Sequence, residues 1–413
     1  MISCLHVLQS VSPAVGGVVE SVKQLNAFYR QQSGDSSAGD SSSGDNLSGD
    51  NSSGENPAIR LEIASIDPPS AGYLDYPGCK VYPLRLKGYD KFFPISLLRW
   101  LRCNSHNYDI FVVDGIWGFH LFVVWLVLHH RHRPYLVFPH GMLDPWFKRR
   151  FPFKHLKKWF AWPWAMYVPL RDARAVIFTC EKERQLARQS FWLYRCNEVV
   201  VPFGTQGIPD PGQDYASAYL ERHSRVRERR CLLFLGRVHP KKGPDLLFHA
   251  LQALQRKGLW DPEQHLLVMA GPCANEYAHT LQRLADQLGI TASIHWTGML
   301  QGPEKWGAFQ SAEAFVLPSH QENYGIAVVE ALSASTPVLI THAINISPEI
   351  VADGAGLVEH DTLEGIFTLL SRWLQLDAPT RQAMRGKARR CFEQRYTIQG
   401  YAEALQSTIR TLV

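Results

Sequence analysis

The stretch Ala314-Phe-Val-Leu-Pro-Ser-His-Gln-Glu322-Asn-Tyr-Gly-Ile-Ala-Val-Val-Glu330 decides how we interpret the fold of this chain. An apolar run predicts a short buried strand, a polar loop follows, and a helical pattern begins near Tyr324 and Gly325. In open α/β sheets, ligands bind beyond the carboxyl ends of the strands, which is where this loop lies. Glu322 and Glu330 would repel a phosphate there. We therefore expect these carboxylates to accept hydrogen bonds from hydroxyl groups, as on a sugar or a ribose.

The same alternation of apolar runs and helical patterns extends in both directions from this stretch. Because the runs are almost continuously apolar, they predict parallel strands in sheets that helices cover on both faces. The expected strands are 2–8, 60–66, 81–84, 110–113, 135–138, 175–178 and 199–201 in the first half, and 231–235, 265–270, 293–296, 314–317, 337–340 and 356–358 in the second. The fold class is therefore α/β, with two doubly wound, Rossmann-like domains in series and a cleft between them.

The alternation is interrupted in the middle of the chain by residues 206–230, which are polar and rich in arginine toward their end. We interpret this segment as a linker between an N-terminal domain, 1–205, and a C-terminal domain, 231–395. The last segment, 396–413, is helical and follows a break near Tyr396.

Residues 33–56 repeat Ser-Gly-Asp and Ser-Ser-Gly and hold almost no apolar side chain. Such a segment buries too little surface to offset the entropy lost on ordering, so we expect a disordered, acidic insertion. An expanded surface loop is the simplest interpretation, and an interaction tether is the alternative.

The composition narrows the class of protein. The chain has 413 residues and a net charge of +5, with 46% hydrophobic and 20% charged residues, which is typical of a globular protein with more than one domain. Its eight cysteines are scattered without a C-x-x-C pair, which favours a reducing cytosol over a disulfide framework or a zinc site. No nucleic-acid-binding motif or signal peptide is evident, and the apolar window 119–128 is too short to span a bilayer.

Gly16 and Gly17 follow the first expected strand and open the first expected helix. Glycine lets the backbone approach a ligand closely, and the N–H groups at the start of a helix suit an anion. The spacing is not the G-x-G-x-x-G of dinucleotide-binding proteins, and a simple turn would explain the pair equally well.

The pattern Leu233-Phe-Leu-Gly-Arg237-Val-His-Pro-Lys241-Lys242-Gly243 is more specific, because its cations come directly after a strand. Arginine offers a planar fork and lysine a point charge, and together they suit a diphosphate. A solvated basic turn is the alternative.

His140 follows another expected strand, in Phe138-Pro-His-Gly-Met-Leu-Asp-Pro-Trp146, where its side chain would face the cleft. A single histidine is more often structural than catalytic, so its role depends on the rest of the chain. The sequence contains no P-loop, H-E-x-x-H or G-x-S-x-G pattern, and its metal-ligand residue types do not cluster.

Residues 146–164 interleave aromatic side chains with cations. The six cations are Lys148, Arg149, Arg150, Lys154, Lys157 and Lys158. This mixture is typical of segments that adsorb to an anionic membrane surface, here the inner face of the plasma membrane of a cytoplasmic protein. A helix that packs its aromatics inward and exposes its lysines explains the pattern equally well. Nothing else in the chain supports the binding of single-stranded nucleic acid.

Taken together, these motifs resemble the retaining glycosyltransferases of the GT-B fold in family 4, a group with many bacterial sugar transferases of polysaccharide assembly. The resemblance extends over nearly the whole chain and rests on Gly16 and Gly17, the block around His140, and the stretches 236–243 and 322–330. It implies a nucleotide-diphosphate sugar donor held mainly by the second domain and a glycan or lipid-linked acceptor held by the first. It also implies that no metal or other cofactor is needed, and that the last helix packs on the N-terminal domain.

The resemblance gives a role to each matched side chain. Arg237 and Lys242 would neutralise the donor diphosphate and stabilise the leaving group. Glu322 would hold a hydroxyl group of the donor sugar, and Glu330 the hydroxyl groups of the ribose. His140 would orient the reacting sugar.

The resemblance also implies contacts to the donor from the backbone of three residues in the second domain and from the glycine pair in the first domain. The N–H groups of Asn323, Tyr324 and Gly325 would contact the sugar or the phosphate. Gly17, with Gly16 beside it, would approach the diphosphate.

The implied mechanism is a front-face attack in which the departing phosphate acts as the base, so no protein nucleophile is required. An epimerase or hydrolase on the same fold would need further acid–base groups, which the sequence does not show. A non-catalytic membrane scaffold would have no use for the matched cations and carboxylates. Two departures from the family pattern are Tyr324, where phenylalanine is usual, and residues 342–349, which lack the usual Gly/Pro/Trp segment.

Overall fold

The computed structural model describes residues 1–13, 16–32, 59–76, 78–150 and 152–412. The insertion predicted at 33–56 lies outside these residues. The chain divides into two compact units, residues 1–204 with 398–413 and residues 205–397, and each is described here by itself.

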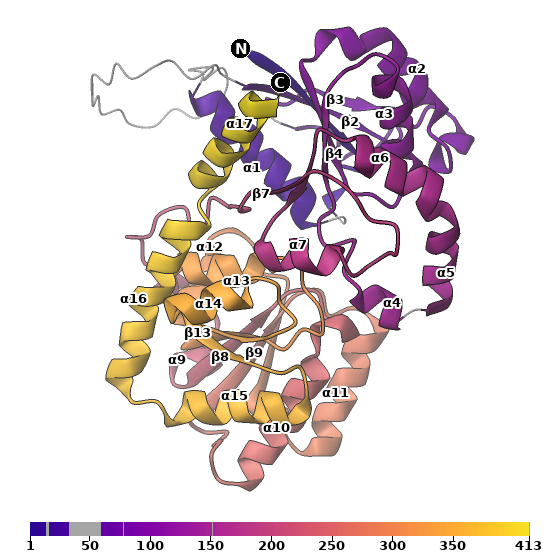
Figure 1. Cartoon of the computed structure of the whole chain (residues 1–413). Helices are drawn as coiled ribbons and strands as arrows, with labels where there is room; N and C mark the ends of the chain where they lie inside the picture. The colour runs from indigo at the N-terminus through magenta and orange to yellow at the C-terminus, as the bar shows by residue number, and fades with distance from the viewer. Residues whose placement is uncertain (14–15, 33–58, 77, 151, 413) are drawn as a thin grey trace, which may run out of the picture. The chain divides into compact units, whose positions relative to one another are not determined.

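The first unit, which includes β2, β3 and β4 in Figure 1, is built on a parallel sheet with the strand order β3-β2-β1-β4-β5-β6-β7. Its strands are β1 (Ile2–Leu8), β2 (Ile59–Ser65), β3 (Val81–Pro83), β4 (Ile110–Asp114), β5 (Tyr135–Phe138), β6 (Ala175–Phe178) and β7 (Glu198–Val200). All residues of β4, β5 and β6 are buried, as expected of strands with helices on both sides.

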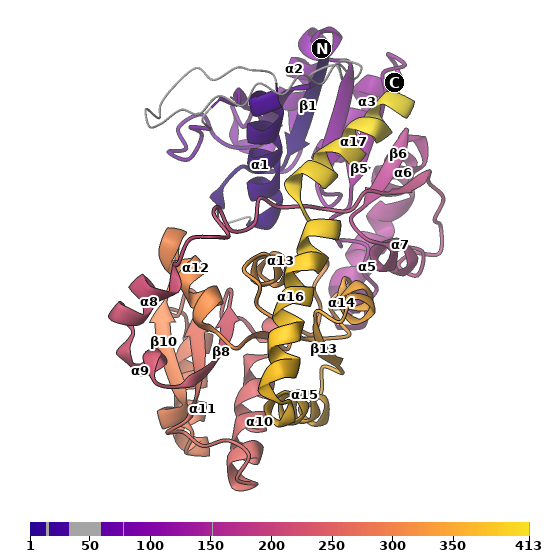
Figure 2. The same ribbon diagram turned by 90° about the vertical axis from the view of Figure 1, so that its left-hand side faces the viewer.

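The helices of the first unit are α1 (Gly17–Gln32), α2 (Ile95–Asn104), α3 (Phe119–His129), α4 (Trp146–Arg150), α5 (Pro152–Ala161), α6 (Tyr167–Asp172), α7 (Glu181–Ala187) and α17 (Ile398–Leu412). Right-handed crossovers place α1 on one face of the sheet and α2 and α3 on the other. α17 packs beside α1 (Figure 2), where the Tyr29 hydroxyl donates a hydrogen bond to the Ala402 carbonyl at 3.2 Å. The C-terminal helix is therefore an integral part of this unit.

The second unit contains a parallel sheet in the order β10-β9-β8-β11-β12-β13. Its strands are β8 (Arg230–Leu235), β9 (His265–Ala270), β10 (Ile294–Gly298), β11 (Ala314–Leu317), β12 (Val338–Thr341) and β13 (Gly356–Glu359). Its helices are α8 (Ala216–Arg222), α9 (Ser224–Arg227), α10 (Pro244–Arg256), α11 (Glu276–Leu288), α12 (Gly302–Ser311), α13 (Ile326–Ser333), α14 (Ser347–Asp353), α15 (Leu363–Gln375) and α16 (Ala378–Arg395). Both parallel sheets confirm the predicted α/β class.

The strand order reverses between β1 and β4 in the first unit and between β8 and β11 in the second. At such a switch point the connections leave in opposite directions and open a crevice beyond the carboxyl ends of the strands, where ligands of α/β proteins bind. The loops that follow these four strands therefore position any site.

One boundary differs from the sequence interpretation. Residues 206–230, which we expected to be a linker, carry α8 and α9 and belong to the second unit. α8 buries Tyr219 and packs on α12, while its other residues are exposed or partly exposed and half of them are polar, so its sequence looks like a linker. The break predicted near Tyr396 lies between α16, which ends at Arg395, and α17. Within the described residues, no helix has the length and apolar character needed to cross a membrane.

Candidate functional site

A lysine and a glutamate meet at the switch point of the second unit. The Lys242 Nζ lies 2.5 Å from the Glu322 Oε1, with the exposed fractions of the two side chains at 18% and 15%. Lys242 comes from the loop after β8 and Glu322 from the loop after β11. The pair therefore depends on how these two loops approach each other.

Gly243 allows the close approach of the two loops. Its φ of +64° lies in the left-handed region, and a Cβ at this position would be 2.3 Å from the carbonyl oxygen of Pro318. The His320 N–H donates to the carbonyl oxygen of Lys241 at 2.9 Å and ties the loops together. A side chain at position 243 would push the loops apart and separate the pair.

The segment after β12 fixes the backbone of Glu322. The Glu322 N–H donates to the Ala343 carbonyl at 3.1 Å, and the Glu322 carbonyl accepts from the Asn345 N–H at 3.0 Å. The Asn345 side-chain amide donates to the Asn323 Oδ1 at 3.2 Å. Gly325, with a φ of +74°, then begins α13 without a side-chain cap. Residues that depart from the family pattern in sequence thus support the loop that carries Glu322.

The second glutamate of the opening stretch has its own lysine. The Lys305 Nζ on α12 lies 2.9 Å from the Glu330 Oε1 on α13, and the Lys305 amine also lies 4.3 Å from the centre of the Trp306 ring. Lys305 could not be predicted as part of the site, because it lies on a different helix and in no recognisable motif.

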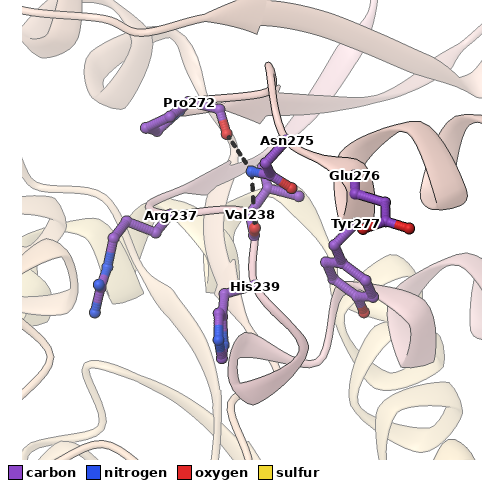
Figure 3. A pocket seen from close by; sticks show the side chains of 7 residues that line it. All are labelled: Arg237, Val238, His239, Pro272, Asn275, Glu276 and Tyr277. Carbon is purple, nitrogen blue, oxygen red and sulfur yellow. Dashed lines mark hydrogen bonds between the residues drawn. The ribbon is translucent and has the colours of Figure 1, made fainter.

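Arg237 begins the loop after β8 and is exposed. It borders a pocket of about 450 Å³ between this loop and the start of α11 (Figure 3). On the far side, the Asn275 side-chain amide donates to the carbonyl oxygens of Val238 and Pro272, each at 3.3 Å. The Arg237 side chain extends away from these bonds, so its guanidinium is open to a ligand (Figure 3).

These groups can serve two kinds of ligand atom at one edge of the sheet. A diphosphate carries more negative charge than a carboxylate and would compete for the Lys242 amine, with Arg237 as a second cation. Glu322 would then be left to accept from hydroxyl groups. Across the described parts of both units, no three His, Cys, Asp or Glu side chains come together as a candidate metal site.

A histidine–aspartate–histidine cluster lies at the switch point of the first unit. Asp114, the last residue of β4, accepts from the His6 Nδ1 at its Oδ2 and from the His140 Nε2 at its Oδ1, each at 2.8 Å. Asp114 and His6 are buried, while the His140 side chain retains 10% of its exposure. Because Asp114 holds Nε2, the other ring nitrogen of His140 is the one left for a ligand.

The environment of this cluster favours the charged forms of Asp114 and His6. Burial alone would lower the pKa of His6, but the charge of Asp114 and the hydrogen bond to it raise that pKa to about 10. Burial alone would raise the pKa of Asp114, but His6 and His140 hold it well below its usual range. The two residues form a buried ion pair, which holds His140 in place.

The backbone around His140 is also held in place by hydrogen bonds. His140 has a φ of +49°, which is uncommon for a residue with a side chain, and its ring stacks on Phe138 with 5.4 Å between centres. The next N–H, of Gly141, donates to the Glu183 Oε1 at 2.5 Å. The other Glu183 oxygen accepts from the N–H and the hydroxyl of Thr179, each at 2.7 Å. A strained backbone held by a buried carboxylate indicates a position that the fold maintains at a cost.

The predicted site residues fall into two groups, one in each unit. Gly16 has a φ of +87° and directly precedes α1, whose first residue is Gly17. In the second unit, the Tyr324 ring is buried and lies edge-on to Tyr396 at 5.8 Å, so a ligand would meet its backbone and not its ring. The sequence analysis missed His6, although the buried cluster depends on it.

Helix α5 contradicts one interpretation of residues 146–164. Phe153, Phe160 and Leu156 are exposed at 86%, 79% and 66%. Lys158 is instead half-buried, with its amine 4.1 Å from the centre of the Trp117 ring. The prediction that this helix packs its aromatics inward and exposes its lysines is therefore wrong for α5.

Two family models match the chain. The model described as "Glycosyl transferases group 1" matches residues 218–390, and the "Glycosyl transferase 4-like domain" matches residues 58–204. Together they cover most of the chain. The first match contains both lysine–glutamate pairs, and the second contains Asp114 and His140.

Curated relatives match part of the chain. The D-inositol 3-phosphate glycosyltransferase of Frankia alni is 34% identical over 151 residues, which is 35% of this chain and 35% of the relative. The enzyme of the same name from Mycolicibacterium smegmatis is 32% identical over 129 residues, 31% of this chain and 28% of the relative. The matches thus span about a third of the length of these relatives.

Solved structures match the chain over its whole length. The structure of Anabaena Alr3699/HepE in complex with UDP has a TM-score of 0.77 at 16% identity and covers 99% of this chain and 100% of that one. WaaG, described as a glycosyltransferase involved in lipopolysaccharide biosynthesis, has a TM-score of 0.65 at 14% identity and covers 99% of both chains. At these identities the likeness shows the fold.

Replacing Asp114 with Asn removes the charge that His6 and His140 share while keeping the side-chain shape. We expect Asp114→Asn to cost ~3–5 kcal/mol of unfolding free energy near neutral pH, as for other broken buried pairs. The share due to His6 is present in full below its unfolded pKa of about 6.5 and is lost as the pH rises through about 10. The share due to Asp114 is present above about pH 3.9 and does not change over this interval. Melting temperatures at about pH 6 and pH 10 should show a smaller gap between wild type and variant at the higher pH.

Asp75→Asn is the matched control, because this carboxylate is exposed in the same unit. It should leave the melting temperature unchanged at both pH values. A gap for Asp114→Asn that stays the same at about pH 6 and pH 10 would contradict the buried ion pair.

Proposed function

This chain belongs to the family 4 glycosyltransferases with the GT-B fold, and we propose that it moves a sugar from a nucleotide-diphosphate sugar to a glycan or lipid-linked acceptor. The contact between Lys242 and Glu322 supports this proposal most strongly. It brings a phosphate-binding group and a hydroxyl-binding group to the edge of the sheet where α/β proteins bind ligands. The donor diphosphate draws the Lys242 amine away from Glu322, and the freed carboxylate accepts from a hydroxyl group of the donor sugar.

The remaining donor contacts come from the same unit. Arg237, exposed at the end of β8, supplies the second cation for the diphosphate. Glu330 accepts from the ribose hydroxyls, with Lys305 holding its carboxylate in place. Because HepE was solved with UDP and with UDP-glucose, uridine nucleotides are the first donors to test.

The proposed reaction retains the configuration at the transferred sugar. The bond between the sugar and the diphosphate breaks, the acceptor oxygen bonds to the same face, and the leaving phosphate takes the acceptor proton. Arg237 and Lys242 stabilise the charge that develops on the leaving group, so a metal ion is not required. His140, positioned by Asp114, orients the reacting sugar.

The proposed setting is the synthesis of an exopolysaccharide, an O-antigen or a glycolipid at a membrane surface. The exposed apolar side chains of α5 and the exposed cations of α4 support contact with an anionic membrane. The described role of WaaG in lipopolysaccharide biosynthesis points in the same direction.

Lys242→Ala should lower kcat/KM for the donor by roughly a hundredfold or more, which is the effect of losing one transition-state donor of about 2.7–4 kcal/mol. Glu322→Ala should lower it as well, because the sugar loses a hydroxyl contact. Turnover of radiolabelled nucleotide sugar, measured with and without acceptor, gives both values and separates transfer from hydrolysis. Lys241→Ala removes the same charge one position earlier and should retain most of the activity. If Lys242→Ala and Glu322→Ala turned over the donor at the wild-type rate, the proposed donor site would be contradicted.

The double variant Phe153→Ser/Phe160→Ser should bind anionic vesicles about tenfold or more weakly, because each phenylalanine adds apolar burial of order 1 kcal/mol at the interface. Co-sedimentation with phosphatidylcholine vesicles that do or do not contain phosphatidylglycerol measures this binding. Val351→Ser changes an exposed apolar side chain of the second unit and should have no effect. If the double variant sediments like wild type, α5 is not the membrane-binding face.

A further inference from the structure

A cavity of about 390 Å³ lies at the switch point of the first unit. It is lined by residues that follow β1, β2 and β4, by the start of α3 and by one side of α5. Gly118 is the N-cap of the eleven-residue helix α3 and gives it no side-chain cap. The cavity therefore occupies the place in this unit where a ligand is expected, and the donor contacts proposed above do not use it.

The charge of the cavity is positive. Three of its lining residues are lysines, Lys91, Lys157 and Lys158, and its carboxylate is Asp90. Both Asp90 oxygens are already used, since they accept from the N–H of Lys87 and from the N–H and hydroxyl of Ser96. The neighbouring His120 is buried, which lowers its pKa and keeps it neutral. The lysines therefore outnumber the one carboxylate, whose role is to hold the start of α2.

Among these cations, Lys158 is the one that indicates an anionic ligand most directly. Its amine is half-buried and lies 4.1 Å from the ring centre of Trp117 and 5.6 Å from that of Phe147. Burial lowers its pKa, and no carboxylate in the described part of the chain pairs with it. A cation withdrawn from water without an anion is unfavourable, and a bound anion would remove that cost.

Helix α5 connects this cavity to an apolar surface. Lys157, Lys158 and Ala161 share the side of the helix that lines the cavity. Phe153 and Phe160 lie on the adjacent side and are exposed. A molecule with an anionic head in the cavity could therefore lay an apolar tail along α5.

We propose that this cavity binds the phosphate group of a lipid-linked acceptor, with Lys158 as the principal contact and the exposed side of α5 against the lipid. The proposal rests on the proposed function, because it assigns the acceptor of that reaction. Two features of one helix carry it, the unpaired cation inside the cavity and the exposed apolar ridge beside it. A phosphate without a lipid would use only the first of these features.

The test is calorimetric titration of the full chain with farnesyl phosphate, inorganic phosphate and farnesol. All titrations contain saturating UDP, so that phosphate sites of the second unit are occupied. We expect farnesyl phosphate to bind wild type at least about tenfold more tightly than either of the other two probes. Lys158→Met should weaken farnesyl phosphate roughly ten- to a hundredfold, the value of one charge-assisted hydrogen bond. Lys80→Met changes an exposed lysine next to β3 that does not line the cavity, and this matched control should bind as wild type does.

Melting temperature distinguishes a lost contact from a damaged fold. Because Lys158→Met removes a half-buried charge, the variant should melt at or above the wild-type temperature while it binds the probe more weakly. Equal affinity of Lys158→Met and Lys80→Met for farnesyl phosphate would overturn the site. Equal affinity of wild type for inorganic phosphate and farnesyl phosphate would overturn the lipid assignment. UDP binding to the wild type is measured separately and tests the proposed function. If the wild type did not bind UDP, the donor site would be contradicted, independently of the lipid-phosphate site.

Discussion

The contact between Lys242 and Glu322 is the interaction on which the candidate site depends. Neither residue could hold its position alone, because each lies in a loop at the end of a strand. Gly243 allows the loops to approach because it has no Cβ, and one backbone hydrogen bond between the loops holds them together. The lysine then neutralises a carboxylate that would otherwise be partly buried and unpaired. In the function that we propose, the same two groups bind a ligand that carries a phosphate beside hydroxyl groups.

The first unit also has a carboxylate with basic partners at its switch point, but there the carboxylate is buried. Asp114 also lies at the end of a central strand, but its partners are two histidines and its burial is nearly complete. His6 supplies the balancing charge, and His140 is the member of the cluster that reaches the surface. In the second unit the paired carboxylate is the group offered to the ligand. In the first unit the Asp114 carboxylate is buried, and it holds His140 in position to contact a ligand.

The strands could be predicted because most are continuous apolar runs between turn residues. The predicted strand 110–113 matches β4 but ends one residue before Asp114, because only the apolar residues of the strand form a recognisable run. A polar residue at the carboxyl end of a buried strand is a usable signal. His6 gave no such signal, because a histidine inside a strand pattern looks like any core residue.

Partners that are distant in sequence escaped prediction for a different reason. Lys305 on α12 contacts Glu330 on α13, which is 25 residues further along the chain, and no local pattern encodes that contact. The composition of residues 146–164 suited two kinds of helix equally well, one that packs its aromatics inward and one that binds a membrane. The structure excludes the first for α5, because Lys158 turns inward while Phe153 and Phe160 turn outward.

We propose that Lys242 and Glu322 form part of the binding site for the sugar donor. A crystal structure of the full chain with the nucleotide sugar that raises its melting temperature most would test this directly. We expect the Lys242 amine to leave Glu322 for a phosphate oxygen and the Glu322 carboxylate to contact a hydroxyl group of the sugar. A structure in which the two side chains stay paired and the nucleotide sugar lies elsewhere would contradict it.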